Sequence, residues 1–273
     1  MSAWINGRRG RHIDYLDRGL QYGDGLFETM RVRGREARLL DYHLDRLYEG
    51  CGRLGIEPPE RRALRREIAR AAAMREEGVL KLIVTRGVGT RGYRPSGSER
   101  CTRILALGAL PPHAAAATLE PLKVKVCRTR LGMSRGLAGL KTLNRLEQVL
   151  ARSEWRDARI GEGLMQDTDD NVVCGTMSNL FLRRGARLVT PPVDRCGVAG
   201  VMRRWILEQA DGAGLRPSMR SVSFDDLSAA DEVFMSNAVA GVMPVGEIRH
   251  GANRIRPSRF DAALALRARL ESL

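Results

Sequence analysis

The chain has 273 residues, of which 43% are hydrophobic, so it can bury a core in one large domain or in two of modest size. No stretch has the apolar run of a secretory signal or the roughly 18 uncharged residues of a membrane span, which predicts a cytoplasmic protein without a membrane partner. Although the net charge is +14, basic residues alternate with acids along the whole chain and only 5% of residues are aromatic, so we expect no nucleic-acid partner.

The first part of the chain alternates turns, strands and helices. A turn-rich segment, DRGLQYGDG, leads into a strand, LFETMRV. Leucine spacing predicts a helix in HLDRLYEGCGRLGI that ends near Gly55, followed by a second helix over roughly 60–75. Two strands, VLKLIVTRG and TRILALGAL, come next, and PPHAAAATLE then breaks the pattern. We therefore predict an N-terminal α/β domain at 1–112 and an interdomain linker at 113–120.

The remainder, residues 121–273, is predicted to form a C-terminal α/β domain that carries the candidate lysine described below. PLKVKVCRTR indicates a strand, and Leu143, Leu146 and Leu150 share one face of a predicted helix in KTLNRLEQVLARSEW. A meander of short strands runs from EGLMQD to LVTPP, and GVAGVMRRWILEQA begins a helix behind glycines. EVFMSNAVAGVMPVGEI predicts a strand and a loop, and the terminal amphipathic helix is expected to be capped by Ser258. The fold class is therefore α/β (α+β).

Few residues could supply an amine, because only Lys81, Lys123, Lys125 and Lys141 are lysines among 46 basic residues. Lys141 follows a glycine-rich loop at the start of a predicted helix, where it could enter a cleft. Burial and neighbouring cations can tune such an amine for covalent chemistry with carbonyl groups, although most lysines at helix starts are surface residues. Lys123 and Lys125 share one solvated strand face, and Lys81 lies in an apolar strand without a glycine-rich approach. Lys141 is thus the candidate.

Several segments could bind anions. GVAGVMRR, residues 197–204, joins a turn to a helix N-terminus, whose N–H groups suit a phosphate, although glycine also serves turns for conformational reasons alone. Arg46 and Asn237 could add phosphate contacts, and Arg91 in TRGVGTRGY could bind a carboxylate or belong to a solvated loop. The chain has no serine elbow, HExxH or Walker motif. Its five cysteines lack a CxxC pair and its four histidines are dispersed, so we expect no metal.

Six segments, taken in order, resemble the fold-type IV pyridoxal-phosphate enzymes, a group of branched-chain aminotransferases, D-amino-acid aminotransferases and 4-amino-4-deoxychorismate lyases. They are DRGLQYGDGLFET, HLDRL, GLKTLNRLEQVLA, TMSNLF, TPPVDRCGVAGVMR and SNA, and together they span nearly the whole chain. The resemblance implies the two-domain D-amino-acid aminotransferase-like fold. It also implies a homodimer, and pyridoxal 5'-phosphate as cofactor in the cleft between the domains.

Within this group, GTRGY, NRLEQVLARSEW and MSNAVAGVMPV look most like the aminodeoxychorismate lyases. That resemblance implies a small-molecule substrate, 4-amino-4-deoxychorismate, which loses pyruvate to give 4-aminobenzoate for folate synthesis. It implies that Lys141 carries the cofactor and moves protons, that Thr29 is a catalytic hydroxyl, and that Arg91 and Tyr93 contact the substrate. The other cofactor contacts that it implies are Arg46, the backbone at Val198 and Ala199, and Asn237.

Cys174 is a departure from the family pattern. Members usually carry a glutamate in the strand that leads to SNLF, where it pairs with the pyridine nitrogen of the cofactor, and a thiol cannot provide that carboxylate. We expect Cys174 to take this place, and Thr142 stands where lyases often have histidine. Two alternatives stay open. One is an aminotransferase of D- or branched-chain amino acids that uses the same Lys141, and the other is a catalytically silent relative kept as a binding protein.

Overall fold

The computed structural model describes residues 2–115 and 120–273, which divide into two compact units. The first unit comprises Met1–Ala115 together with Leu140–Asn144, and the second comprises Ala116–Gly139 together with Arg145–Leu273. The candidate lysine thus belongs to the first unit, whereas the sequence placed it in the C-terminal domain. Residues 116–119 of the predicted linker lie outside the described residues, and a short helix, α4 (Pro112–Ala115), precedes them.

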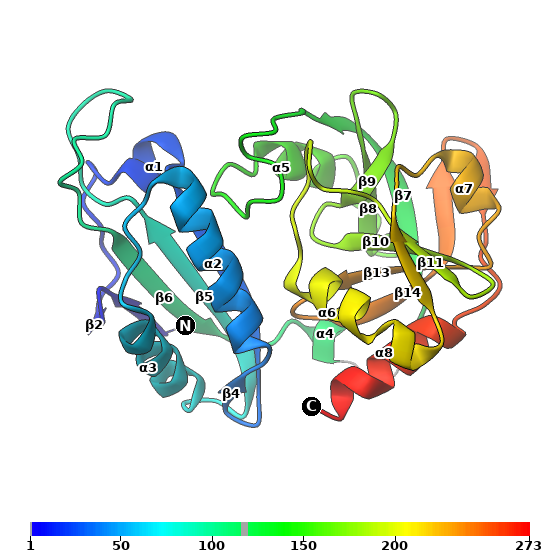
Figure 1. Cartoon of the computed structure of the whole chain (residues 1–273), viewed down its shortest axis with the longest axis horizontal. Helices are drawn as coiled ribbons and strands as arrows, with labels where there is room; N and C mark the ends of the chain where they lie inside the picture. Colours follow the sequence, from blue (N-terminus) through cyan, green and yellow to red (C-terminus); the bar gives the residue numbers. More distant parts are fainter. Residues whose placement is uncertain (1, 116–119) are drawn as a thin grey trace. The chain divides into compact units, whose positions relative to one another are not determined.

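A six-stranded antiparallel sheet forms the first unit, in the order β2-β1-β6-β5-β3-β4. The helices α2 and α3 cover one of its faces (Figure 1). The elements are β1 (Ser2–Ile5), β2 (Arg8–Arg9), α1 (Arg18–Tyr22), β3 (Gly25–Arg33), β4 (Glu36–Ala37), α2 (Leu40–Leu54), α3 (Arg61–Ala72), β5 (Glu77–Thr85) and β6 (Thr102–Gly108).

The core of the first unit lies between this sheet and the two helices. Alternation along β3 turns Leu26 and Met30 toward the helices, and Leu44, Leu47 and Cys51 of α2 meet them at helical spacing. All five are almost fully buried, and each large side chain contributes roughly 1.5–3 kcal/mol of transfer free energy. The core therefore fixes β3 and α2 against each other, and these two elements carry the candidate residues of this unit.

A nine-stranded sheet forms the second unit, in the order β12-β11-β10-β13-β14-β7-β8-β9, with β15 paired to β14. Because β9 pairs with both β8 and β10, six of these strands close into a ring. The elements are β7 (Leu122–Leu131), α5 (Leu146–Arg152), β8 (Glu162–Asp167), β9 (Val172–Gly175), β10 (Asn179–Arg184), β11 (Arg187–Thr190), α6 (Val201–Gln209), β12 (Arg216–Met219), α7 (Phe224–Ser228), β13 (Glu232–Asn237), β14 (Gly241–His250), β15 (Asn253–Ile255) and α8 (Asp261–Glu271).

Most predicted elements are confirmed, and the mixed α/β class with them. The helix expected to end near Gly55 does so, because this glycine adopts φ 61° and caps α2 in the left-handed conformation. Within the described residues, no helix is both long enough and apolar enough to cross a membrane.

Three local predictions were wrong. DRGLQYGDG contains the helix α1, because the Asp17 side chain accepts the Gly19 N–H and so caps it. The helix expected from Lys141 onward begins only at Leu146, and the apolar face predicted for it is exposed at Leu146 and Leu150. Ser258 does not cap the terminal helix, which starts behind Phe260 without a side-chain cap.

Candidate active site

Lys141 lies on an extended segment that pairs with the outer edge of β3. The Phe27 N–H donates to the Lys141 carbonyl at 2.9 Å, and the Leu143 N–H donates to the Gly25 carbonyl at 3.0 Å. Leu140, just before the lysine, is buried against the first unit. The backbone on both sides of Lys141 is therefore held by β3, so the amine extends from a fixed point rather than from a fraying helix start.

The Phe27 ring is shared by two lysines. The Nζ atom of Lys141 lies 4.1 Å from the ring centroid and that of Lys81 lies 5.1 Å from it. Thr29 follows Phe27 by two residues and is paired directly with Lys81 of β5, so these three side chains share one face of the sheet. Lys81 was not predicted as a site residue, because it lies in an apolar strand without a glycine-rich approach. An exposed lysine in an otherwise apolar strand was the available signal.

On the other side of β3, Glu28 joins two residues of α2. Glu28 is 2% exposed, and its Oε1 accepts the Arg46 Nε–H at 2.8 Å while Oε2 accepts from Arg46 Nη2 and lies 2.6 Å from His43 Nδ1. Burial raises the pKa of Glu28, but the charge of Arg46 and the hydrogen bond of His43 outweigh it and bring that pKa to about 2. Glu28 is therefore ionised at any ordinary pH.

His43 is neutral in this arrangement. Burial lowers the pKa of His43, against the hydrogen bond to Glu28, which raises it, and the charge of Lys141 also reaches the ring. Because the Glu28 carboxylate can only accept, Nδ1 carries the hydrogen, and among the described residues the buried Nε2 has no hydrogen-bond partner. We call Phe27, Glu28, His43, Arg46 and Lys141 the Lys141 cluster. Its cations outnumber its single carboxylate, which favours an anionic ligand.

In the second unit, the glycine turn at 197–200 pairs with the residue that precedes the lysine segment. The Gly139 N–H donates to the Gly197 carbonyl at 3.1 Å, and the Ala199 N–H donates to the Gly139 carbonyl at 2.9 Å. Only Leu140 separates Gly139 from Lys141, so the chain holds their Cα atoms within roughly 7 Å of each other. The turn is thus paired to Gly139, the residue at which the chain of the second unit leads into the lysine segment.

The pairing at this turn bears on the two predicted backbone contacts to a phosphate. The Ala199 N–H donates to Gly139, and its contact with a phosphate stays a prediction. Among the described hydrogen bonds none uses the Val198 N–H, and α6 begins three residues later, at Val201, with Gly200 as its N-cap and no side-chain cap. Val198 and the first N–H groups of α6 are therefore the better donors to an anion.

Asn237 closes the turn between β13 and β14. Its Oδ1 accepts the N–H groups of Val239 at 3.0 Å and Ala240 at 2.8 Å. The side-chain oxygen is thus committed to the turn, and an anion could be bound only through the amide nitrogen.

Cys174 packs in a hydrophobic cluster of the second unit with Cys127, Trp155 and Met165. Burial raises the pKa of the Cys174 thiol to about 12, so the thiol stays neutral. Its predicted position opposite a pyridine nitrogen stays a prediction. Two charged side chains act on the thiol, Glu162 and Arg145, and neither was found from the sequence.

Glu162 is a buried carboxylate at the start of β8. Its oxygens accept five hydrogen bonds from four residues of the same unit, and all of these donors are neutral. They are the N–H groups of Gly163 at 2.9 Å, Thr176 at 3.1 Å and Met177 at 3.2 Å, the Thr176 hydroxyl at 2.5 Å and the Ser178 hydroxyl at 2.7 Å. Glu162 thus holds the turn that follows Cys174.

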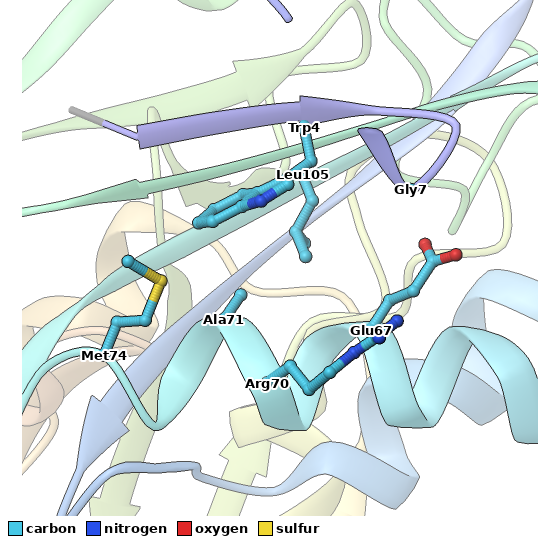
Figure 2. Close-up of a pocket in the computed structure, with 7 residues that line it drawn as sticks. All are labelled: Trp4, Gly7, Glu67, Arg70, Ala71, Met74 and Leu105. Atoms are coloured by element: carbon cyan, nitrogen blue, oxygen red, sulfur yellow. The ribbon is translucent and has the colours of Figure 1, made fainter. Parts of the chain in front are cut away.

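The two predicted substrate residues, Arg91 and Tyr93, lie on the loop 86–101 between β5 and β6 and are both exposed. A surface hollow elsewhere in the first unit is lined by residues of β1, α3 and β6 and their neighbours (Figure 2). No member of the Lys141 cluster lines it, so it carries none of the predicted chemistry.

The comparison with known families decides the family. The model of the amino-transferase class IV family matches residues 25–248, which include every predicted site residue from Thr29 to Asn237. The chain belongs to the class IV aminotransferase family. Members of this family depend on pyridoxal phosphate, and the expected fold-type IV architecture is confirmed.

Three proteins that are similar to this family member are two aminodeoxychorismate lyases and one putative aminotransferase. The chain is similar to an aminodeoxychorismate lyase of Vibrio harveyi, with 35% identity over 92% of this chain and 93% of the relative. It is 30% identical to a putative branched-chain-amino-acid aminotransferase of Methanocaldococcus jannaschii, over 91% of this chain and 88% of the other. The solved 4-amino-4-deoxychorismate lyase of Pseudomonas aeruginosa matches with a TM-score of 0.90 and 45% identity, over 99% and 98% of the two chains.

Proposed function

We propose that this chain is a pyridoxal-phosphate-dependent lyase that converts 4-amino-4-deoxychorismate to 4-aminobenzoate and pyruvate, a step of folate synthesis. One observation supports this most. Lys141, whose backbone is paired to β3, acts electrostatically on His43 of an arginine–glutamate–histidine group in the same unit, and the chain is 45% identical to a lyase of that name. The comparison favours the lyase over the aminotransferase, for which the reported identity is 30%.

The Lys141 cluster fits pyridoxal phosphate. Lys141 would be linked to its carbonyl carbon, and Arg46, already oriented by Glu28, would meet its phosphate. The Val198 N–H, the N-terminus of α6 and the Asn237 amide would add neutral donors. When bound, the cofactor supplies an electron sink that acidifies the carbon bearing the substrate's amine.

The chain's own residues then have distinct tasks. The Lys141 amine takes the proton from the carbon that bears the amine, and the Thr29 hydroxyl on the same sheet face can hold a proton near it. Breakage of the neighbouring carbon–oxygen bond releases pyruvate as its enol and leaves an aromatic ring. The exposed cations Lys81 and Arg91, with the Tyr93 hydroxyl, are suited to the substrate's carboxylates.

The neutral thiol at Cys174 suits an elimination better than a transamination. Transamination must store a carbanion until it is reprotonated elsewhere, which relies on a protonated pyridine nitrogen. In the elimination the electrons leave with the adjacent oxygen. A buried thiol that stays neutral can neither protonate that nitrogen nor keep it protonated.

A homodimer in the cytoplasm completes the proposal. Leu146, Val149 and Leu150 are exposed on one face of α5, an apolar surface that a second copy could cover. All five cysteines are free thiols, as is usual in a reducing compartment.

The test is the release of 4-aminobenzoate from 4-amino-4-deoxychorismate by the purified protein, measured beside its cofactor absorbance and its amino transfer from D-alanine or leucine to a keto acid. We expect 4-aminobenzoate release with little amino transfer. Amino transfer without 4-aminobenzoate would establish the aminotransferase instead. Absence of both activities and of cofactor absorbance would establish the silent relative.

A further inference from the structure

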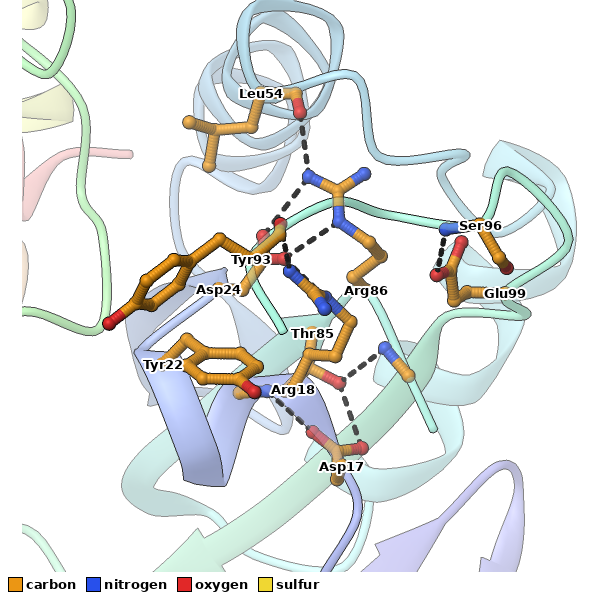
Figure 3. A network of polar contacts seen from close by, with 12 residues as sticks. Asp17, Arg18, Tyr22, Asp24, Leu54, Thr85, Arg86, Tyr93, Ser96 and Glu99 are labelled. Carbon is orange, nitrogen blue, oxygen red and sulfur yellow. Dashed lines mark hydrogen bonds and ion pairs between the residues drawn. The ribbon is translucent and has the colours of Figure 1, made fainter. Parts of the chain in front are cut away.

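The loop 86–101 is held at its middle by a buried arginine of α1 (Figure 3). Arg18 is 3% exposed, and its two terminal nitrogens donate to consecutive carbonyls of the loop, Nη1 to Gly92 and Nη2 to Tyr93, each at 2.8 Å. A planar guanidinium can bind two acceptors at once, whereas an ammonium group acts as a single point charge. Arg18 thus fixes the backbone next to Arg91.

Tyr22, on the same helix, holds the same residues from another side. Its hydroxyl accepts the Gly92 N–H at 3.1 Å, and its ring meets the Tyr93 ring edge-on, with centroids 5.5 Å apart. The Arg18 guanidinium lies 4.8 Å from the centre of the Tyr22 ring. Both backbone polar groups of Gly92 are therefore bound by α1. Figure 3 shows the side chains of Arg18, Tyr22 and Tyr93.

Asp24 holds Arg18 in place. Its carboxylate accepts Arg18 Nε at 3.0 Å and Arg86 Nε at 2.7 Å, and Arg86 also donates to the carbonyls of Leu54 and Gly55 at the C-terminal end of α2. Cations are favourable at that end of a helix. The loop is thereby connected through two arginines and one carboxylate to the helix that carries His43 and Arg46.

The C-terminal end of α1 also contacts the lysine segment. Gly23 caps α1 with φ 68°, and a Cβ atom there would lie 2.2 Å from Oδ1 of Asn144. Asn144 follows Lys141 by three residues, and Leu143 is hydrogen bonded to Gly25. One short helix therefore contacts both the lysine segment and the loop with Arg91 and Tyr93.

We propose that Arg18 and Tyr22 are positioning residues, which hold Arg91 and Tyr93 where the substrate's carboxylates bind and so set the affinity for substrate. This inference rests on the proposed function. Neither residue touches the reacting atoms, so their removal acts on KM and leaves the lysine chemistry, measured by kcat and cofactor absorbance, nearly unchanged.

The experiment uses the full-length holoenzyme with Arg18→Lys and Tyr22→Phe, and Arg103→Lys as matched control. Arg103 makes a comparable two-point contact in the same unit, to Glu67 at 2.9 and 2.7 Å, but lies outside the loop. We expect Arg18→Lys to raise KM for 4-amino-4-deoxychorismate about tenfold and Tyr22→Phe about threefold, with kcat within about threefold of wild type. The control should match wild type.

Limited digestion with trypsin supplies a readout independent of activity. The bond between Arg91 and Gly92 should be cut faster in Arg18→Lys and Tyr22→Phe than in wild type and control, because its neighbourhood has lost its anchors. An unchanged rate of cutting in both variants would show that Arg18 and Tyr22 do not hold the loop 86–101. Faster cutting with unchanged KM, or an equal fall in kcat and rise in KM, would overturn the role in substrate affinity. A wild-type enzyme that releases no 4-aminobenzoate would refute the proposed function, and with it the role of Arg18 and Tyr22 in substrate affinity. The rate of trypsin cutting would still show whether the two residues hold the loop.

Discussion

Two buried carboxylates, one in each unit, are satisfied in opposite ways. Glu28 in the first unit is paired with the Arg46 guanidinium and the His43 ring, whereas Glu162 in the second accepts only neutral N–H and hydroxyl groups. The first arrangement orients charged groups around the lysine, and the second shapes a turn behind a neutral thiol. Glu28 is thus neutralised by charged partners beside the candidate lysine, whereas Glu162 is held by neutral donors next to a thiol that stays neutral.

The largest effect is expected from the removal of Lys141, the candidate amine of the first unit. Lys141→Ala should abolish the cofactor's lysine-bound absorbance and lower turnover by roughly three orders of magnitude or more, because covalent linkage and proton transfer are both lost. Lys123→Ala is the matched control, because Lys123 lies on β7 of the second unit. Near-normal 4-aminobenzoate release by Lys141→Ala would assign the chemistry to another group.

The two carboxylates can be compared directly by Glu28→Gln and Glu162→Gln. Removal of the Glu28 charge leaves Arg46 without its buried counter-ion, and we expect the free energy of unfolding to fall by about 3–5 kcal/mol. Glu162→Gln keeps one acceptor oxygen and disturbs no ion pair, so we expect a fall of about 2 kcal/mol. Urea unfolding of both variants measures this. Equal losses would remove the contrast between the units.

Cys174→Glu would place a carboxylate in the second unit, at the position that is predicted to face the pyridine nitrogen. A carboxylate at this position could keep the pyridine nitrogen protonated, so transamination should gain about tenfold relative to pyruvate elimination. Parallel assays of amino transfer and 4-aminobenzoate release check the ratio, with Cys127→Ser as a control for disturbing the same hydrophobic cluster. Equal gains in both reactions would mean that Cys174 does not face that nitrogen.

The smallest expected effect is on pH dependence. The pKa of His43 is lowered in the folded protein, so the unfolded chain binds the extra proton first, and stability falls as pH drops below the unfolded value near 6.5. The pKa of Glu28 is about 2 in the folded protein, so the free energy of unfolding falls further as pH drops below 4.5. Between pH 7.5 and 5.5, the free energy of unfolding of His43→Gln, measured with urea, should therefore fall less than that of wild type. A parallel slope for the two proteins would show that His43 titrates normally.

Much of the fold was predictable because its signals are local. Leu44, Leu47 and Cys51 recur at helical spacing, and Gly55 supplies the left-handed cap, so the helix and its end follow from neighbouring residues. The glycine-rich approach to Lys141 predicted it as the key amine, and this role stays a prediction. Its backbone conformation was not predicted, because the segment's helical propensity is overridden by pairing with Phe27, more than a hundred residues away.

The parts of the site that sequence reasoning missed depend on distant partners. The Glu162 carboxylate, which acts on the Cys174 thiol, is held by the hydroxyls of Thr176 and Ser178. These two residues lie 14 and 16 positions further along the chain. Lys81 reaches the Phe27 ring only because β5 pairs with β3 in one register. Arg18 lies 74 residues before the Gly92 carbonyl that it binds. No spacing rule within one segment could have joined such pairs.

The passage of the lysine segment through the first unit also bears on how the protein is made. A nascent chain that has grown to Ala115 still lacks Leu140–Asn144, so the outer edge of β3 at Leu26 and Phe27 emerges from the ribosome without its partner. Unpaired strand edges invite pairing with other chains. At about 5–20 residues per second, the missing segment follows within a few seconds. Until then the first unit is incomplete, so slow translation between 116 and 144 would prolong its exposure to aggregation and to chaperones.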